Sequence, residues 1–373
     1  MNVARFFAAG MALCLASGAL AQTPDALWQG ILANPPALEH TDARHVALKA
    51  LDERLMQPDS ERAPDVIAYY HRAVDRALDA LEAEPPAKGI RLFQLYSSSV
   101  IVQTPETVFA IDLDQGPHEN RSRTGPDAAV RFGMTPEHIA RLARLVDIAF
   151  HTHEHDDHVD YEITKTLCES GKTVVVTASN REHWQDEPWA GQLIVLEQTL
   201  AKPHTVGVLT VDVLHDYQWD NETHTGGTPC NAYLITTPGG TGVLSKGDIN
   251  CGLRLYGWLQ IMAANGRHVD LVTGSPGFWR GVNTAREIDA LFSPVWAIGH
   301  VWEFTHRSAG KPGGATGTYT ANLMMTRHLF QKGTPVVLSW GEYLDLGPDR
   351  TPGRAPGSTT HVRTGASRSH SRN

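Results

Sequence analysis

The stretch of sequence that decides the fold is His151-Thr152-His153-Glu154-His155-Asp156-Asp157-His158. It directly follows the apolar segment Val146-Asp147-Ile148-Ala149-Phe150, whose composition is typical of a short buried strand. Loops at the ends of strands commonly carry active sites, because the strands hold them in place while the loops stay free to vary. The run therefore predicts a chemical site at one edge of a sheet.

The spacing of the ionisable residues in this run indicates a metal site. His153 and His155 alternate and can converge on one ion, while Asp157 and His158 can turn toward a second. Imidazole and carboxylate are good ligands for zinc, and a set without thiolates favours an open, hydrolytic site over a closed structural one. His151 lies outside the tight pattern, so we expect it to support the ligands rather than bind metal.

Strand and helix patterns alternate along most of the chain. A helix is expected to begin at Thr135-Pro136. Many strands with fewer helices predict an α/β fold of layered sheets covered by helices. Besides the strand at 146–150, the predicted strands are 90–95, 99–104, 108–112, 172–177, 207–214, 231–236, 242–245, 269–273, 295–298 and 335–338.

Residues 22–89 are predicted to form a helical extension packed on the catalytic domain, which spans 90–346. Helical periodicity covers residues 38–84, with Pro64 near the start of its second helix and Pro85-Pro86 after its end. Two apolar stripes mark the expected buried faces: Val46, Leu48, Leu51 and Leu55, then Val66, Ile67, Tyr70, Val74, Leu78 and Leu81.

The two ends of the chain differ from the rest. Residues 1–21 resemble a secretory signal, with Arg5, an uncharged apolar run and the motif Ala19-Leu20-Ala21, so we expect a periplasmic or secreted protein. Residues 347–373 are rich in Pro, Gly, Ser, Thr and Arg and are predicted to be a disordered basic tail. No other stretch is apolar enough to predict a membrane span.

Charge and cysteine content exclude several classes of protein. The net charge is −9 although the tail is basic, and an acidic body argues against nucleic-acid binding. Cys168, Cys230 and Cys251 are scattered and form no zinc-thiolate motif. A disulfide between Cys230 and Cys251 is the one pairing we predict.

Residues 152–158 resemble the T-H-x-H-x-D-H signature of the metallo-β-lactamase superfamily. The resemblance extends to Leu95–Val102, Ile111-Asp112, Gly227–Ile235 and Ser245-Lys246-Gly247-Asp248, which are similar to the branch that includes ascorbate-6-phosphate lactonase and N-acyl-phosphatidylethanolamine phospholipase D. It implies a four-layered αβ/βα sandwich with two divalent metal ions, most simply zinc, at one edge of the sheets.

The resemblance also implies the remaining ligands. Asp248 matches the aspartate that bridges the two ions, and His300, which follows the strand 295–298, matches the last histidine. For the third histidine of the first ion, His215 follows a strand as in this branch, whereas His224 matches the classical branch. The Gly-Thr-Pro-Cys run after His224 favours His215.

The remaining histidines and aromatic residues have less specific interpretations. His204 is expected to be structural, and neither His306 nor His328 directly follows a buried strand. An anionic substrate group could meet Arg280, although a surface salt bridge is an equal alternative. Five aromatic residues could line a pocket or simply belong to the core: Phe278, Trp279, Trp302, Phe304 and Trp340.

The predicted metal ligands are thus His153, His155, Asp157, His158, His215, Asp248 and His300, and Asp157 is the predicted catalytic residue. The implied activity is hydrolysis of an ester, lactone, amide or phosphodiester bond in a small molecule, by a hydroxide that the metals make available. Two alternatives stay open: a di-iron redox enzyme of the same fold and a non-catalytic periplasmic metal-binding protein.

Overall fold

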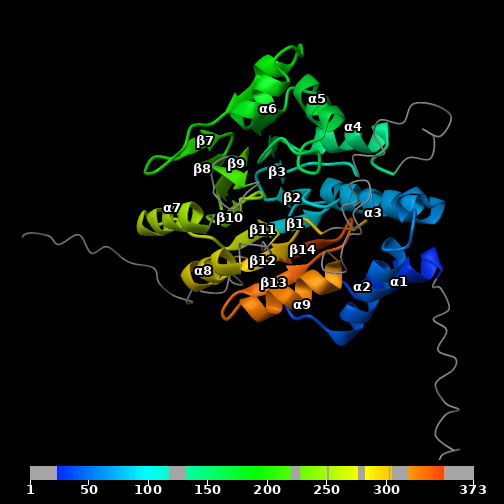
Figure 1. Ribbon diagram of the computed structural model, residues 1–373. Helices are drawn as coiled ribbons and strands as arrows, with labels where there is room; N and C mark the ends of the chain where they lie inside the picture. The colour runs from blue at the N-terminus through cyan, green and yellow to red at the C-terminus, as the bar shows by residue number, and fades with distance from the viewer. Residues whose placement is uncertain are drawn as a thin grey trace, which may run out of the picture.

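Two seven-stranded sheets form the centre of the protein (Figure 1). The computed structural model describes residues 23–116, 132–219, 227–249, 252–275, 282–301, 303–304 and 318–347. The predicted signal at 1–21, residues 348–373 of the tail, and Cys251, His224, His306, Phe278, Trp279, Arg280 and Trp302 lie outside these residues.

Each sheet combines antiparallel and parallel strands. In the first, antiparallel pairing runs from β14 to β3 and parallel pairing from β3 to β6. Its order is β14 (Tyr343–Leu346), β1 (Ile90–Gln94), β2 (Val100–Gln103), β3 (Val108–Ile111), β4 (Ile148–Phe150), β5 (Thr173–Val176) and β6 (Leu193–Val195).

The second sheet has the same division. Pairing is parallel from β13 to β10 and antiparallel from β10 to β7. Its order is β13 (Thr334–Val337), β12 (Val295–Ile298), β11 (Leu271–Gly274), β10 (Gly242–Ser245), β9 (Gly227–Thr236), β8 (Leu209–Trp219) and β7 (His204–Val206). The sequence patterns had not indicated β6, β7 or β14.

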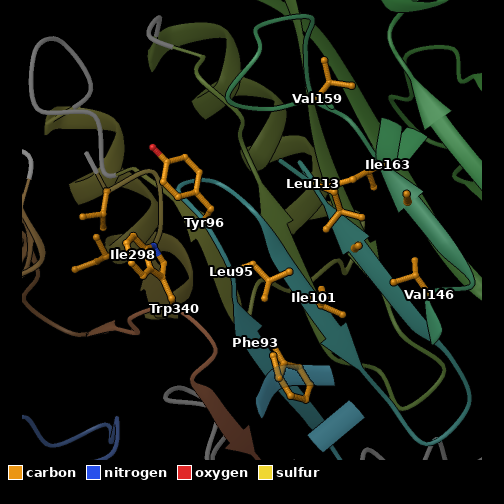
Figure 2. Close-up of a cluster of buried hydrophobic side chains, with 14 of the residues drawn as sticks. Phe93, Leu95, Tyr96, Ile101, Leu113, Val146, Val159, Ile163, Ile298 and Trp340 are labelled. Carbon is orange, nitrogen blue, oxygen red and sulfur yellow. The ribbon is translucent and has the colours of Figure 1, made fainter. Parts of the chain in front are cut away.

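Alternation of side chains along the strands explains the layers. One set of buried residues from both sheets, including Val102, Phe150, Val213 and Leu271, forms the core between them. The opposite faces carry a second apolar set, including Phe93, Ile101 and Trp296, which packs against helices. Figure 2 shows Ile163 of the helix 161–169 beside Leu113, which follows β3 of the first sheet.

Helices cover both outer faces, so the predicted four-layered α/β sandwich is confirmed. On one side lie α4 (Pro136–Leu145), which Thr135 caps as predicted, α5 (Tyr161–Glu169) and the short α6 (Ala178–His183). The other side carries α7 (Gly252–Ala264), α8 (Val282–Phe292) and α9 (Tyr319–Leu329). Two short 3₁₀ helices span Ser60–Arg62 and Ala190–Gln192.

The N-terminal segment forms three helices, α1 (Pro24–Ala33), α2 (Asp42–Leu55) and α3 (Pro64–Glu82), whose apolar residues join the core of the outer layers. The stripe predicted for α3 is buried throughout. On α2 the prediction for Val46 is wrong, because its side chain is 63% exposed. The buried face of α2 instead includes Arg44 and Asp52.

Polar contacts attach these helices to the C-terminal part of the sandwich. The Arg44 guanidinium pairs with the buried Glu342 carboxylate and donates to the Val337 carbonyl. Gly341, with φ of 68°, lies so close to α3 that a Cβ atom there would come within 1.9 Å of the Ala73 carbonyl oxygen. Among the described residues, no helix combines the length and apolarity that crossing a membrane requires.

Candidate metal centre

Most of the predicted ligands come from loops at the carboxyl ends of parallel strands, together with Asp112, which was not predicted to bind metal. Asp112 follows β3, the run 151–158 follows β4, Asp248 lies three residues beyond β10, and His300 follows β12. Neighbouring parallel strands end at the same edge of their sheet, so these loops gather there, as in open α/β sheets that bind ligands. A hydrogen bond from the Asn231 amide to the Thr152 carbonyl joins the two sheets at this edge.

Two groups of side chains could each hold a metal ion. One consists of His153, His158 and Asp248, the other of Asp157, His158 and His300. Within each group the donor atoms lie within 4.8 Å of one another. His158 belongs to both groups, so five of the seven sequence-predicted ligands meet in two adjoining clusters.

Hydrogen bonds to one ring nitrogen leave the other available for a metal. The Asp112 carboxylate accepts from the Thr152 amide at 2.7 Å and hydroxyl at 2.9 Å, and from Nδ1 of His158 at 2.9 Å. The Thr152 hydroxyl in turn accepts from Nδ1 of His153 at 3.0 Å. These contacts favour the tautomers in which Nε2 of His153 and His158 is unprotonated, as ligation requires.

The electrostatics of the clusters follow from burial and opposite charges. Burial alone would lower the pKa of His158, but the carboxylates of Asp248, Asp157 and Asp112 outweigh it and raise this pKa well above its ordinary value. Burial would raise the pKa of Asp248, yet His300 and His158 hold it well below its usual range. The acidic groups are therefore poised to bind cations, with protons bound by histidine where no metal is present.

Asp248 and Asp157 have partners that orient them. Gln218 donates from its side-chain amide to the Asp248 carboxylate at 3.0 Å. The Asp157 carboxylate lies 3.1 Å from Nε2 of His300. The role of Gln218 had no signal in the sequence, because its place opposite Asp248 depends on the pairing of β8 with β9 and of β9 with β10.

Gly247 lets the Asp248 loop approach the histidine loop. Its φ is 50°, and a Cβ atom there would lie 2.7 Å from both the Cys230 sulfur and the Thr152 Cβ. Only glycine fits this conformation and this spacing without displacing its neighbours. Cys230 is a free, buried thiol, so the predicted disulfide with Cys251 is wrong.

Two predicted ligands lie outside both clusters. The ring of His155 is 4.7 Å from that of His153, but its Nε2 contacts the Thr228 hydroxyl at 3.1 Å. The Nε2 atom of His215 contacts the Leu196 carbonyl at 2.9 Å.

The structure does not bring His215 to the site, for a reason that lies in the strand. Residues three apart in a regular strand point to opposite faces. Because Gln218 points to Asp248, His215 faces away from it. The competing candidate, His224, is outside the described residues.

The other residues singled out in the sequence lie elsewhere. His151 is buried, with Nδ1 3.2 Å from the His158 carbonyl, which suits the supporting role predicted for it. His204 contacts the Glu197 carbonyl at 2.8 Å. Phe304 and Trp340 are core residues beside Tyr96, which Figure 2 shows near Trp340.

The side chains that are present fit divalent metal ions. Among the described residues, the buried Nε2 atoms of His153 and His158 have no hydrogen-bond partner, and both belong to the clusters. A buried polar atom without a partner costs free energy unless another ligand meets it. Histidine and carboxylate donors without a thiolate suit zinc, iron or manganese.

Comparisons with known proteins show a distant structural likeness. No protein-family model and no curated protein matches the chain. Igni18, a metallo hydrolase from Ignicoccus hospitalis, is 15% identical, with 69% of this chain and 98% of that chain covered and a TM-score of 0.47. YhfI from Bacillus subtilis, a metallo-β-lactamase fold protein, is 13% identical, with 69% and 100% covered and a TM-score of 0.44.

A third solved structure is CmlA, a diiron β-hydroxylase from Streptomyces venezuelae. It is 16% identical, with 70% of this chain and 55% of that chain covered and a TM-score of 0.45. Likeness at this level assigns neither a family nor an activity to the chain.

Proposed function

We propose that this protein is a dinuclear metal-dependent hydrolase of the metallo-β-lactamase superfamily, acting on an ester, lactone, amide or phosphodiester bond of a small molecule. The observation that carries the proposal is the pair of adjoining clusters with His158 in common. Two clusters with donor sets of this size suit two ions that act on one substrate.

The residues divide between the two ions as follows. His153, with His155 beside it, would hold the first ion, and Asp157, His158 and His300 would hold the second. Asp248 would bridge the two, because it lies with His153 in one cluster and its Oδ2 is 3.4 Å from His300. Zinc is the simplest choice of metal for these donors.

Divalent ions bound here would lower the pKa of a coordinated water toward neutrality and polarise the bond to be cleaved. Asp157 is suited to orienting the attacking water, because its side chain is 28% exposed, whereas those of His158 and His300 are 2% and 9% exposed. A periplasmic or secreted location, from the signal at 1–21, is part of the proposal.

The test is hydrolysis by purified protein loaded with zinc, assayed on panels of lactones, amides and phosphodiesters. We expect one class to be cleaved, with the rate abolished by chelation and restored by zinc, and lowered at least about 100-fold in Asp157→Ala. His328→Ala, which changes an exposed histidine on α9, is the matched control and should keep full activity. A protein that binds two ions yet cleaves none of these substrates would support non-catalytic metal binding instead. Consumption of an oxidant by the iron-loaded protein, without hydrolysis, would support a redox enzyme.

A further inference from the structure

The turn between β1 and β2 contacts three of the loops that form the site. The Ser97 carbonyl accepts from the His300 amide at 2.9 Å. The Ser98 hydroxyl donates to the Asp157 carbonyl, and the Ser99 hydroxyl donates to the Asp112 carbonyl at 3.0 Å. A shift of this turn would therefore displace Asp157 and His300, the two ligands that belong to the second cluster alone.

The turn and the ligand loop are both held in an uncommon backbone conformation. Ser97 has φ of 48° and His300 has φ of 54°, in the left-handed region that costs residues with a side chain free energy. Such conformations persist where surrounding contacts fix them. The Ser97 carbonyl also accepts from the Gln94 side chain at 2.8 Å, so the turn is fixed from β1 as well.

A buried carboxylate fixes the other side of the turn. Glu303 is 3% exposed, and its Oε1 accepts from the Ser97 amide at 3.1 Å, the Trp340 indole at 3.0 Å and the Tyr319 hydroxyl at 3.2 Å. Three donors from separate segments thus meet on one oxygen. Burying a carboxyl group in this apolar layer is costly, which calls for a reason why it is there.

The contacts continue to the N-terminal helices. Tyr319 is the first residue of α9, and its amide donates to the Asp52 carboxylate of α2 at 2.9 Å. The Thr320 amide donates to the same carboxylate at 2.9 Å. A continuous series of hydrogen bonds therefore runs from α2 through Tyr319, Glu303 and Ser97 to His300.

We propose that Glu303 is a positioning residue that fixes His300 and Asp157 for the second metal ion, and that α2 and α9 hold Glu303 in place. The inference rests on the proposed function, because it concerns the affinity of the second metal site. It gives the N-terminal helices a role in the site, although they contribute no ligand among the described residues.

The test is a stepwise Co²⁺ titration of metal-free protein, followed by visible absorption and calorimetry, which resolves two binding steps. Glu303→Leu keeps the volume but removes the acceptor, and should weaken the second step about tenfold while changing the first less than about twofold. Glu303→Gln keeps an acceptor oxygen and should bind within about threefold of the wild type at both steps. Tyr319→Phe removes only the contact from α9 and should weaken the second step by a smaller factor.

Asp289→Leu is the matched control. Asp289 is also a buried carboxylate, and it accepts from the amides of Gln331, Lys332 and Gly333 at the end of the strands remote from the site. Its loss should lower stability without a selective change in the second binding step. Should Glu303→Leu fail to fold, Tyr319→Phe decides.

Equal weakening of both steps, or no change in the second step for Glu303→Leu and Tyr319→Phe, would overturn the proposal. Absence of any Co²⁺ binding by the wild type would instead refute the proposed function. The two failures are therefore distinguishable.

Discussion

Replacing Asp112 with asparagine should weaken metal binding without disturbing the fold. One carboxylate oxygen accepts from the Thr152 amide, and an asparagine oxygen can keep that bond. The other oxygen accepts from Nδ1 of His158, and in the variant an amide group takes its place and can only donate. Nδ1 must then become the acceptor, which moves the ring proton to Nε2, the atom that should bind metal.

The magnitude follows from this change of tautomer. Removing a partner that orients a metal-binding histidine weakens metal binding about 10- to 100-fold, which corresponds to about 1.4 to 2.7 kcal/mol. The backbone should accept the change, because Asp112 has φ of 51° and asparagine tolerates that region better than most residues. The loss should therefore appear in metal affinity rather than in folding.

The assay is calorimetric titration of metal-free protein with Zn²⁺ at one pH, combined with thermal unfolding. Asp289→Asn is the control, since it changes a buried aspartate remote from the site and should leave the affinity unchanged. Unchanged zinc affinity in a folded Asp112→Asn variant would refute the assignment of Nε2 of His158 as a ligand.

Three further predictions concern stability, measured by urea unfolding of metal-free protein. Burial raises the pKa of Glu303 from 4.5 to about 7, so its carboxyl group lowers the free energy of unfolding as the pH rises through about 7. The stability of Glu303→Gln relative to the wild type should therefore increase by roughly 2 to 3 kcal/mol between pH 5 and pH 8.5. A stability difference that does not change with pH would contradict this. Arg44→Met should lower the free energy of unfolding by about 3 to 5 kcal/mol, because it leaves the Glu342 carboxylate buried and unneutralised. Adding Glu342→Gln should recover part of that loss, and additive losses from the two substitutions would argue against the ion pair. Gly341→Ala should lower the free energy of unfolding by about 3 kcal/mol or more, because its Cβ would meet the Ala73 carbonyl. Gly266→Ala, at a φ of 76° in open space, should lower it by only about 1 to 2 kcal/mol. Equal losses in the two variants would contradict the packing of α3.

Features that depend on local chemistry were predictable from the sequence. The strands 242–245 and 295–298 have the predicted bounds, because each is a short apolar run between clear turn signals. The ligands His153, Asp157 and His158 were predictable because they lie close together in sequence and follow a buried strand. Asp248 and His300 could be assigned only through resemblance, and the structure brings both to the site.

Features that depend on pairing between distant segments were not predictable. The direction of His215 depends on the register of β8, which the sequence pattern alone does not give. Val46 was placed on a buried face because periodicity counts apolar residues, whereas α2 buries Arg44 and Asp52 against distant partners. Glu303 carried no signal at all, since its three donors come from separate parts of the chain.

The most direct test of the account is the metal content of the purified protein, measured by plasma mass spectrometry after zinc is supplied and excess metal is removed. We predict about two ions per chain in the wild type and in His328→Ala, and a loss of about one ion per chain in His158→Ala, because the single free ring nitrogen of His158 can ligate only one ion. A wild type that retains no metal, or a folded His158→Ala variant that retains as much as the wild type, would contradict the claim that these clusters form a dinuclear metal centre.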